Sequence, residues 1–117
     1  AHILDNVSKS GKVLGEILED LKKKHPSVGD VRYIGLFSAI ELVKDRETKE
    51  PLVAYGKDPD GIMGSIIGKL KAKGFMTYSH ENMILIAPPL IITEEQVREE
   101  MAKVDEVLYD VDAMTAK

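Results

Sequence analysis

The first apolar stripe of the chain predicts an amphipathic helix. Its apolar residues recur every three or four positions, and lysines and glutamates occupy the opposite side. Lys22, Lys23 and Lys24 are cations that suit a helix C-terminus, and Pro26 ends the helix. These lysines could bind an anion, but a solvated helix end is the preferred interpretation, and His25 is taken as part of that end. The stripe consists of Val7, Leu14, Ile17, Leu18 and Leu21.

The same spacing predicts two further helices. The second is expected from about Pro59 to Lys73, with Asp58 as its N-cap. The third begins at a capping box formed by Thr93 and Gln96. The two apolar stripes are Ile62, Met63, Ile66, Ile67 and Leu70, and Val97, Met101, Val104, Leu108 and Val111.

Three glycines share one side of the second helix, namely Gly61, Gly64 and Gly68. Each costs about 1 kcal/mol of helix propensity relative to alanine. We therefore expect close packing against that side, on the sheet or on another domain. A phosphate-binding loop is disfavoured because the glycines lie within the helix and not ahead of it.

Segments rich in β-branched and aromatic residues predict strands between the helices. Residues 31–44 are interpreted as two strands on either side of Gly35, where a bulge is preferred over the close approach of a ligand or another backbone. Residues 75–78 and 83–86 predict two more strands, joined by a polar turn at 79–82.

The resulting order of elements is helix, strand, strand, helix, strand, strand, helix. Hairpin-length links indicate an α+β fold, with a three- to four-stranded, mainly antiparallel sheet and the helices on one face. The other face would be bare, and we expect it to meet the rest of a longer protein. Glu41 stands among apolar residues, so its carboxylate should face solvent, a cation or a partner surface.

Composition limits the classes of function. The chain has 117 residues, 44% of them hydrophobic, which suffices for one core. A formal charge of -4 without a concentrated basic face argues against nucleic acid as a partner. The absence of cysteine excludes disulfides and thiolate metal sites, and no apolar segment approaches the ~20 residues that span a membrane. The chain opens on Ala1 without an initiator methionine, and we expect it to be a piece of a longer protein.

Few residues suggest chemistry. The three histidines are far apart in sequence, so a metal site is not expected, and the chain has neither a cysteine nucleophile nor a glycine-flanked serine. One polar cluster, Tyr78, Ser79, His80 and Glu81, combines hydroxyl, base and acid beside buried strands. It could face a ligand, although an ordinary solvated turn is the preferred interpretation.

Three stretches of the sequence resemble the C-terminal small domain of class III aminotransferases, the ω-amino-acid, 4-aminobutyrate and ornithine aminotransferase group. They are residues 28–45, the helix end and turn at 70–75, and the Ala-Pro-Pro-Leu corner at 87–90 followed by Thr93 and its two glutamates. The resemblance covers nearly the whole chain, so residues 1–117 are expected to form that small domain. It implies a cytoplasmic homodimer that transfers an amino group from an amine to a keto acid and uses pyridoxal 5'-phosphate.

The resemblance also implies which residues are elsewhere. In that family the Schiff-base lysine, the aspartate beside the pyridine nitrogen and the phosphate-binding loop belong to the large domain, and no lysine here stands in a matching context. We therefore expect no catalytic, cofactor-binding or metal-binding residue in this chain, and no activity from it alone. The alternative is a stand-alone α+β module for ligand binding or protein interaction.

One family position bears on the substrate. Two residues before the proline corner, the 4-aminobutyrate and ornithine enzymes carry an arginine that binds a substrate carboxylate, and here that residue is Leu85. The resemblance therefore favours a pyruvate-type acceptor and an ω-amino donor such as taurine or β-alanine. It also places Tyr78, Ser79 and His80 near the acid group of the substrate.

Overall fold

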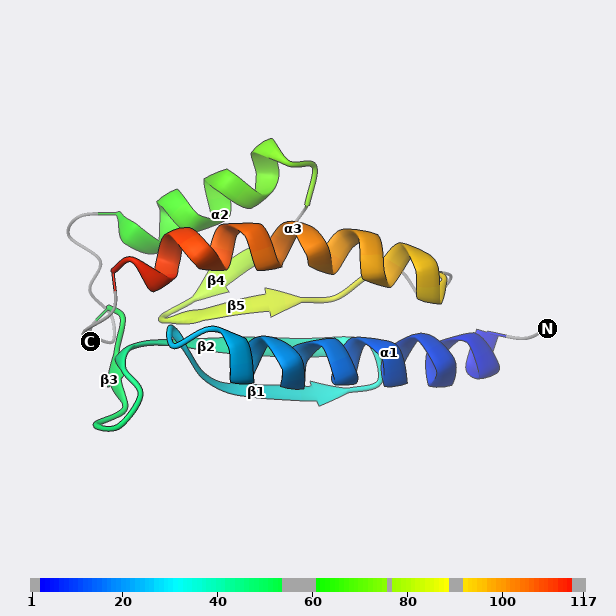
Figure 1. Cartoon of the computed structure of the whole chain (residues 1–117). Helices are drawn as coiled ribbons and strands as arrows, with labels where there is room; N and C mark the ends of the chain where they lie inside the picture. The colour runs from blue at the N-terminus through cyan, green and yellow to red at the C-terminus, as the bar shows by residue number, and fades with distance from the viewer. Residues whose placement is uncertain (1–2, 54–60, 76, 89–91, 115–117) are drawn as a thin grey trace.

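The described part of the chain forms a layer of three helices packed on a five-stranded sheet (Figure 1). The structure is a computed structural model that describes residues 3–53, 61–75, 77–88 and 92–114, with the backbone alone at 3–6. The elements are α1 (Ile3–Lys24), β1 (Val28–Ile34), β2 (Phe37–Asp45), β3 (Glu50–Pro51), α2 (Ile62–Ala72), β4 (Tyr78–His80), β5 (Met83–Ile86) and α3 (Glu94–Asp112).

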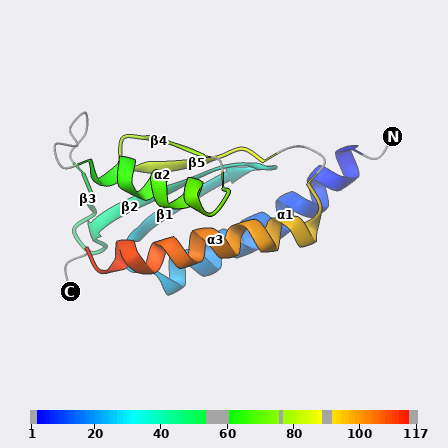
Figure 2. The ribbon, with the colours of Figure 1, turned by 90° about the horizontal axis from the view of Figure 1, so that it is seen from above.

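The sheet confirms the predicted α+β class. Strands β1, β2, β5 and β4 lie side by side in that order, and each neighbouring pair is antiparallel. The two-residue strand β3 pairs with the end of β2 and is one strand more than predicted. Figures 1 and 2 show the three helices on the same side of the sheet, so its other side is uncovered in the described chain.

Helix α1 and helix α3 lie side by side and run in the same direction, so their C-terminal ends are neighbours (Figures 1 and 2). The apolar stripes predicted for them face the core, and α3 starts at the predicted capping box. The backbone N–H of Gln96 donates to Thr93 Oγ1 at 3.1 Å, and the N–H of Thr93 donates to Gln96 Oε1 at 2.9 Å. At the same end of the bundle, the buried hydroxyl of Ser10 in α1 donates to the carbonyl of Ile92 at 2.8 Å.

Gly35 belongs to a tight turn, so the preferred bulge is wrong. Residues 35–36 join β1 to β2, and Gly35 has a φ of 58°, which glycine adopts without strain. The close approach of another backbone was the lesser alternative, and α1 provides it. A Cβ atom on Gly11 would lie 2.8 Å from the Gly35 carbonyl oxygen, so the helix needs glycine at this crossing.

Several boundaries differ from the predictions. Strand β1 begins at Val28, three residues before the predicted start at residue 31. Helix α2 begins at Ile62 with Gly61 as its N-cap, and the predicted cap Asp58 and Pro59 lie outside the described residues. Strand β4 begins only at Tyr78, because Phe75 turns into the core directly after Gly74. The turn predicted at 79–82 is only 81–82, so the two residues before it are part of β4.

The glycine side of α2 faces away from the core. A Cβ atom built on Gly61, Gly64 or Gly68 would have nothing within 4 Å. The expected packing of this side on the sheet is therefore wrong. Packing on a domain beyond the described residues is still a prediction.

Candidate functional site

The uncovered side of the sheet carries Tyr78 and His80, two of the three residues that the sequence singled out for substrate binding. Side chains alternate along a strand, and the helix-facing set is buried, including Ile40, Ile84 and Ile86. The opposite set is more exposed, and we call it the open face. The open face comprises Arg32 and Ile34 of β1, Phe37, Ala39 and Glu41 of β2, Met83 and Leu85 of β5, and Tyr78 and His80 of β4.

Large apolar side chains on the open face are exposed to an unusual degree. Ile34 is 84% exposed, Phe37 52% and Tyr78 58%. Ile34 and Phe37 are cross-strand partners, so they form one apolar patch at the end of the β1–β2 hairpin. Contiguous exposed apolar surface is typical of interaction sites.

The structure brings two of the three predicted substrate residues together. Tyr78 lies opposite Leu85 and His80 lies opposite Met83, so both are on the open face. Ser79 lies opposite the buried Ile84, hence on the helix side, because neighbouring strand residues point to opposite faces. The three residues therefore do not form one cluster.

Two contacts fix the open face near Leu85. The hydroxyl of Thr77 donates to the Leu85 carbonyl, which holds the residue before β4 against β5. Arg32 and Glu41 form an ion pair with 3.7 Å between Nη2 and Oε2, so the carboxylate of Glu41 faces a cation, one of the predicted environments. The Leu85 side chain is half-buried and apolar, and it offers no hydrogen bond to a substrate acid group.

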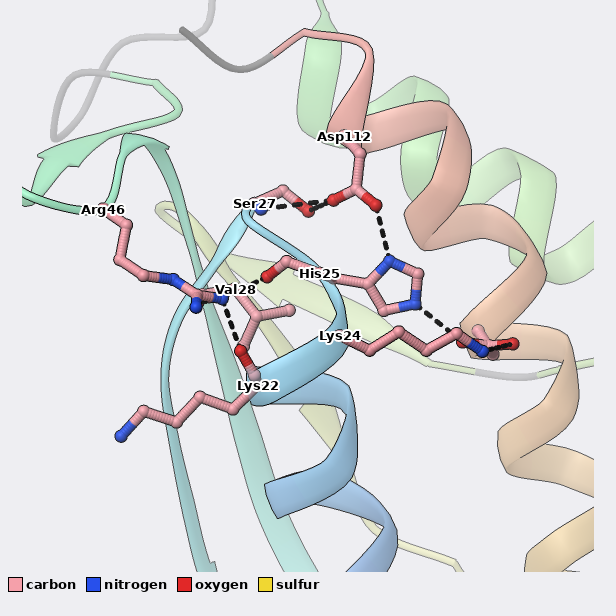
Figure 3. Close-up of polar contacts among 8 residues, drawn as sticks. Lys22, Lys24, His25, Ser27, Val28, Arg46 and Asp112 are labelled. Atoms are coloured by element: carbon pink, nitrogen blue, oxygen red, sulfur yellow. Dashed lines mark hydrogen bonds and ion pairs between the residues drawn. The ribbon is translucent and has the colours of Figure 1, made fainter. Parts of the chain in front are cut away.

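A buried polar cluster joins the C-terminal ends of α1 and α3, and the sequence did not predict it (Figure 3). His25 is fully buried, so its assignment to a solvated helix end is wrong. Its Nδ1 lies 2.6 Å from Asp112 Oδ2 and its Nε2 lies 2.6 Å from Asp105 Oδ1. Ser27 donates to Asp112 Oδ1 from both its hydroxyl, at 2.6 Å, and its backbone N–H, at 3.2 Å. We call His25, Ser27, Asp105 and Asp112 the His25 cluster.

Two cations, Lys24 and Arg46, bind groups of the His25 cluster. Lys24 Nζ lies 2.9 Å from Asp105 Oδ2. Burial raises the pKa of Asp105, but hydrogen bonds from His25 and Lys24 outweigh it and hold that pKa below its usual value. From the turn after β2, Arg46 donates to the carbonyls of Lys22, His25 and Val28 and so caps the end of α1 (Figure 3).

The cluster holds serine, histidine and aspartate, but not in the arrangement of a catalytic triad. In a triad the serine hydroxyl donates to the histidine, whereas Ser27 donates to Asp112 and both ring nitrogens of His25 face carboxylates. The ring has no exposed surface on which a substrate could lie. Its role is to join the ends of α1 and α3. No local pattern in the sequence indicated this cluster, because Asp105 and Asp112 lie 80 and 87 positions after His25.

A cavity of about 750 Å³ lies where α1, the end of β5 and the start of α3 meet. Its walls are mainly apolar, as at Leu14, Ile86 and Met101. Among its polar residues, Thr93 and Gln96 are engaged in the capping box and Glu100 binds Lys103. The cavity therefore presents little of the convergent polar chemistry that orients a small-molecule ligand.

The residues needed for a cofactor or metal do not converge in the described chain. The lysines of the described ranges are exposed or half-exposed, whereas a Schiff-base lysine requires a desolvated pocket. Within the same ranges, no three histidine, cysteine or acidic side chains are grouped to bind a metal ion. None of the described helices is long and apolar enough to cross a membrane.

Comparison with known proteins assigns the family. The model of the family described as aminotransferase class-III matches residues 1–108. The taurine–pyruvate aminotransferase of Bilophila wadsworthia is 35% identical over 118 residues, which cover 95% of this chain and 25% of that protein. The ethanolamine-phosphate phospho-lyase homolog 1 of Caenorhabditis elegans is 36% identical over 110 residues, covering 92% of this chain and 22% of that protein.

Solved structures agree with this result. The taurine:2-oxoglutarate aminotransferase from Bifidobacterium kashiwanohense, in complex with PLP and glutamate, is 42% identical and superimposes with a TM-score of 0.91 over 97% of this chain and 25% of that one. The chain belongs to the class-III aminotransferase family. It spans about a quarter of the length of the relatives it matches.

Proposed function

We propose that residues 1–117 are the C-terminal small domain of a pyridoxal-phosphate-dependent class-III aminotransferase, which transfers an amino group from an ω-amino donor to a keto acid. The observation that carries the proposal is the family match over residues 1–108, within a chain that equals a quarter of its relatives. A stand-alone binding or interaction module is not favoured, because the family match extends over nearly every element.

The cofactor is proposed to be bound elsewhere in the parent enzyme. Pyridoxal phosphate supplies the electron sink for amino-group transfer, and it needs a lysine in a dry pocket. The described lysines of this chain do not meet that requirement. In this proposal the large domain holds the cofactor, and the chain alone does not transfer amino groups.

We assign the open face to the inside of the parent enzyme. Its apolar patch at Ile34 and Phe37 would be covered by the large domain. The parent enzyme is proposed to be a cytoplasmic homodimer. The small-molecule amine and keto acid would then meet Tyr78 and His80, which lie on that face. Ser79 lies on the helix side, so it is the weakest member of the proposed substrate set.

A pyruvate-type acceptor is the preferred keto acid. With 2-oxoglutarate, the product is glutamate, whose second carboxylate needs a cation, and Leu85 cannot supply one. The two taurine aminotransferases among the relatives are named for different acceptors, pyruvate in one and 2-oxoglutarate in the other. The choice for this chain therefore depends on the residues of its own open face.

The test is the acceptor preference of the full-length parent with taurine as donor. We expect a larger kcat/KM for pyruvate than for 2-oxoglutarate. Leu85→Arg should raise kcat/KM for 2-oxoglutarate relative to pyruvate about tenfold, since a charge-assisted hydrogen bond contributes about 1.5–3 kcal/mol. Met83→Arg is the matched control, because Met83 lies on the same strand and face beside His80.

Three outcomes would contradict the proposal at different levels. A wild-type preference for 2-oxoglutarate would refute the acceptor assignment alone. Phosphate release from ethanolamine phosphate without amino transfer would replace the reaction with that of the phospho-lyase relative. Amino transfer by the purified 117-residue chain, with added pyridoxal phosphate, would refute its role as a small domain that depends on another part of the enzyme.

A further inference from the structure

The contacts of His25 require more protons than a neutral histidine carries. A neutral imidazole has one N–H and one bare nitrogen, and an ionised carboxylate only accepts hydrogen bonds. Both nitrogens of His25 lie 2.6 Å from carboxylate oxygens, on Asp105 and Asp112. Two donors on the ring satisfy this geometry, and only the imidazolium has two.

We propose that the His25 cluster is a pH-dependent latch, in which the imidazolium of His25 holds the C-terminal ends of α1 and α3 together and its deprotonation at alkaline pH releases them. The proposal does not depend on the proposed enzymatic function. It rests on the position of one fully buried ring between two carboxylates of another helix.

The charges around the ring favour the protonated state. From α3, Asp105, Asp112 and Tyr109 lie against the ring; the Tyr109 ring is in an edge-to-face arrangement with it, with 4.7 Å between the centroids. Lys24 pairs with the outer oxygen of Asp105, and Arg46 binds the His25 carbonyl but not the ring. Two acids therefore contact the imidazole directly, whereas the two cations contact only its partners or its backbone.

The helix ends act in the same direction. The C-terminus of a helix carries a partial negative charge that a nearby cation stabilises. The last turn of α3 has no basic residue of its own and contains Asp112. Because α1 and α3 run in the same direction, His25 at the end of α1 supplies the missing cation (Figures 1 and 3).

Loss of the proton would break the latch, because the ring has no exposed surface at which water could take over the lost hydrogen bond. A bare ring nitrogen would face a carboxylate oxygen at hydrogen-bond distance, and a ring with no exposed surface cannot gain a solvent partner without movement. The last turn of α3 would separate from Ser27, which binds the same Asp112. The effect is thus expected at the C-terminal ends of the two helices and not in the sheet.

The protonation state can be measured directly on the wild-type chain with ¹⁵N-labelled histidine. At pH 7.5 we expect NMR to show protons on both ring nitrogens of His25. His80, which is exposed on β4, provides a solvent-accessible histidine for comparison in the same spectrum. A neutral His25 with one unprotonated nitrogen at this pH would overturn the proposal.

The consequence for stability is tested by denaturant unfolding between pH 6 and 9. An unfolded histidine loses its proton near pH 6.5, so above about that pH the unfolding equilibrium constant should rise up to tenfold per pH unit while the folded ring stays charged. His25→Gln should lose this dependence and His80→Gln should keep it. Equal pH dependence in wild type and His25→Gln would refute the latch. Should His25→Gln not fold, Asp112→Asn replaces it with the same expected loss.

Discussion

The chain places two histidines in opposite environments, although both stand at polar ends of predicted elements. His80 lies exposed on the edge strand β4, beside Tyr78 on the open face, whereas His25 is fully buried between two aspartates of α3. What separates them is not their local sequence but what the fold brings to them. The helix side of the sheet is closed on itself, and the open face has no partner in the described residues.

Ion pairs show the same contrast. On the open face Arg32 and Glu41 approach to 3.7 Å, with the arginine side chain 67% exposed. In the His25 cluster two carboxylates lie 2.6 Å from a ring with no exposure. Exposed pairs of the first kind contribute little to stability, whereas removing one partner from a buried contact leaves a buried polar group unsatisfied. The cluster is therefore expected to contribute more to stability than the ion pair on the open face.

The largest expected effect on stability distinguishes the two faces of strand β5. Ile84 is fully buried on the helix side of β5, and its neighbour Leu85 is on the open face. Ile84→Ala should lower the free energy of unfolding of the chain by about 2–5 kcal/mol, because it leaves a cavity in the core. Leu85→Ala should cost under about 1 kcal/mol, since this side chain keeps part of its exposure in the folded state. Urea unfolding of both variants checks the difference.

Equal losses for the two variants would show that the open face is covered in the isolated chain. Self-association would be one cause, and unfolding at several protein concentrations separates it. A two-state dimer unfolds at higher urea as its concentration rises, and a monomer does not.

Apolar periodicity predicted the helices, hairpin-length links predicted the antiparallel pairing, and the spacing of Thr93 and Gln96 predicted the capping box, because each of these signals lies within a short stretch of sequence. Thr93 and Gln96 form reciprocal bonds that any chain with this local pattern can form. The position of Gly35 was recognised as special, but a bulge was preferred, because sequence alone does not show that Ile34 and Phe37 are paired. The start of β4 was also misplaced, because residues 79–82 were taken as a turn. Ser79 was therefore grouped with Tyr78 and His80, although it points to the opposite face of the strand.

The His25 cluster was missed for a physical reason. A lysine-rich helix end followed by proline indicates solvent, and burial of a histidine there requires acids that lie 80 and 87 positions away. Asp105 and Asp112 are seven residues apart and therefore on one side of α3, a spacing that is also common on solvated helices. Only the parallel course of α1 and α3 turns these separate patterns into one site.

The next effect contrasts the two kinds of ion pair. Asp112→Asn removes the charge that accepts from His25 and Ser27, and it should cost about 1.5–3 kcal/mol of the free energy of unfolding at pH 6. Glu41→Gln on the open face should cost under about 1 kcal/mol. Chemical denaturation measures both, with an unchanged far-UV circular dichroism spectrum as the criterion for a native fold. A harmless Asp112→Asn would contradict the structural role of the cluster.

Substitution of glycine by alanine is expected to have opposite effects at a covered and at an uncovered helix surface. Gly11→Ala should destabilise the chain, because its Cβ would lie 2.8 Å from the backbone oxygen of Gly35. Gly68→Ala on α2 meets nothing within 4 Å and should stabilise the chain by up to about 1 kcal/mol through helix propensity. Thermal unfolding of the two variants gives the sign of each effect. In the full-length parent, a loss of stability with Gly68→Ala would reveal a domain packed on that side of α2, as the sequence predicts.

The smallest expected effect is the loss of stability at acidic pH that Asp105 causes. The pKa of Asp105 is below its usual value, since the hydrogen bonds from His25 and Lys24 outweigh its burial. The folded state therefore binds this proton less readily than the unfolded state, so the stability that Asp105 contributes is present above about pH 4 and is lost as the pH falls further. We expect a contribution of about 1 kcal/mol or less, because the side chain is 26% exposed and partly screened. Asp105→Asn should flatten the decline in urea midpoint between pH 5 and 3, whereas Asp20→Asn, on the exposed side of α1, should follow the wild type. Parallel profiles for Asp105→Asn and the wild type would mean that the carboxylate gains nothing from its buried partner, and that the His25 cluster differs from the open face in geometry alone.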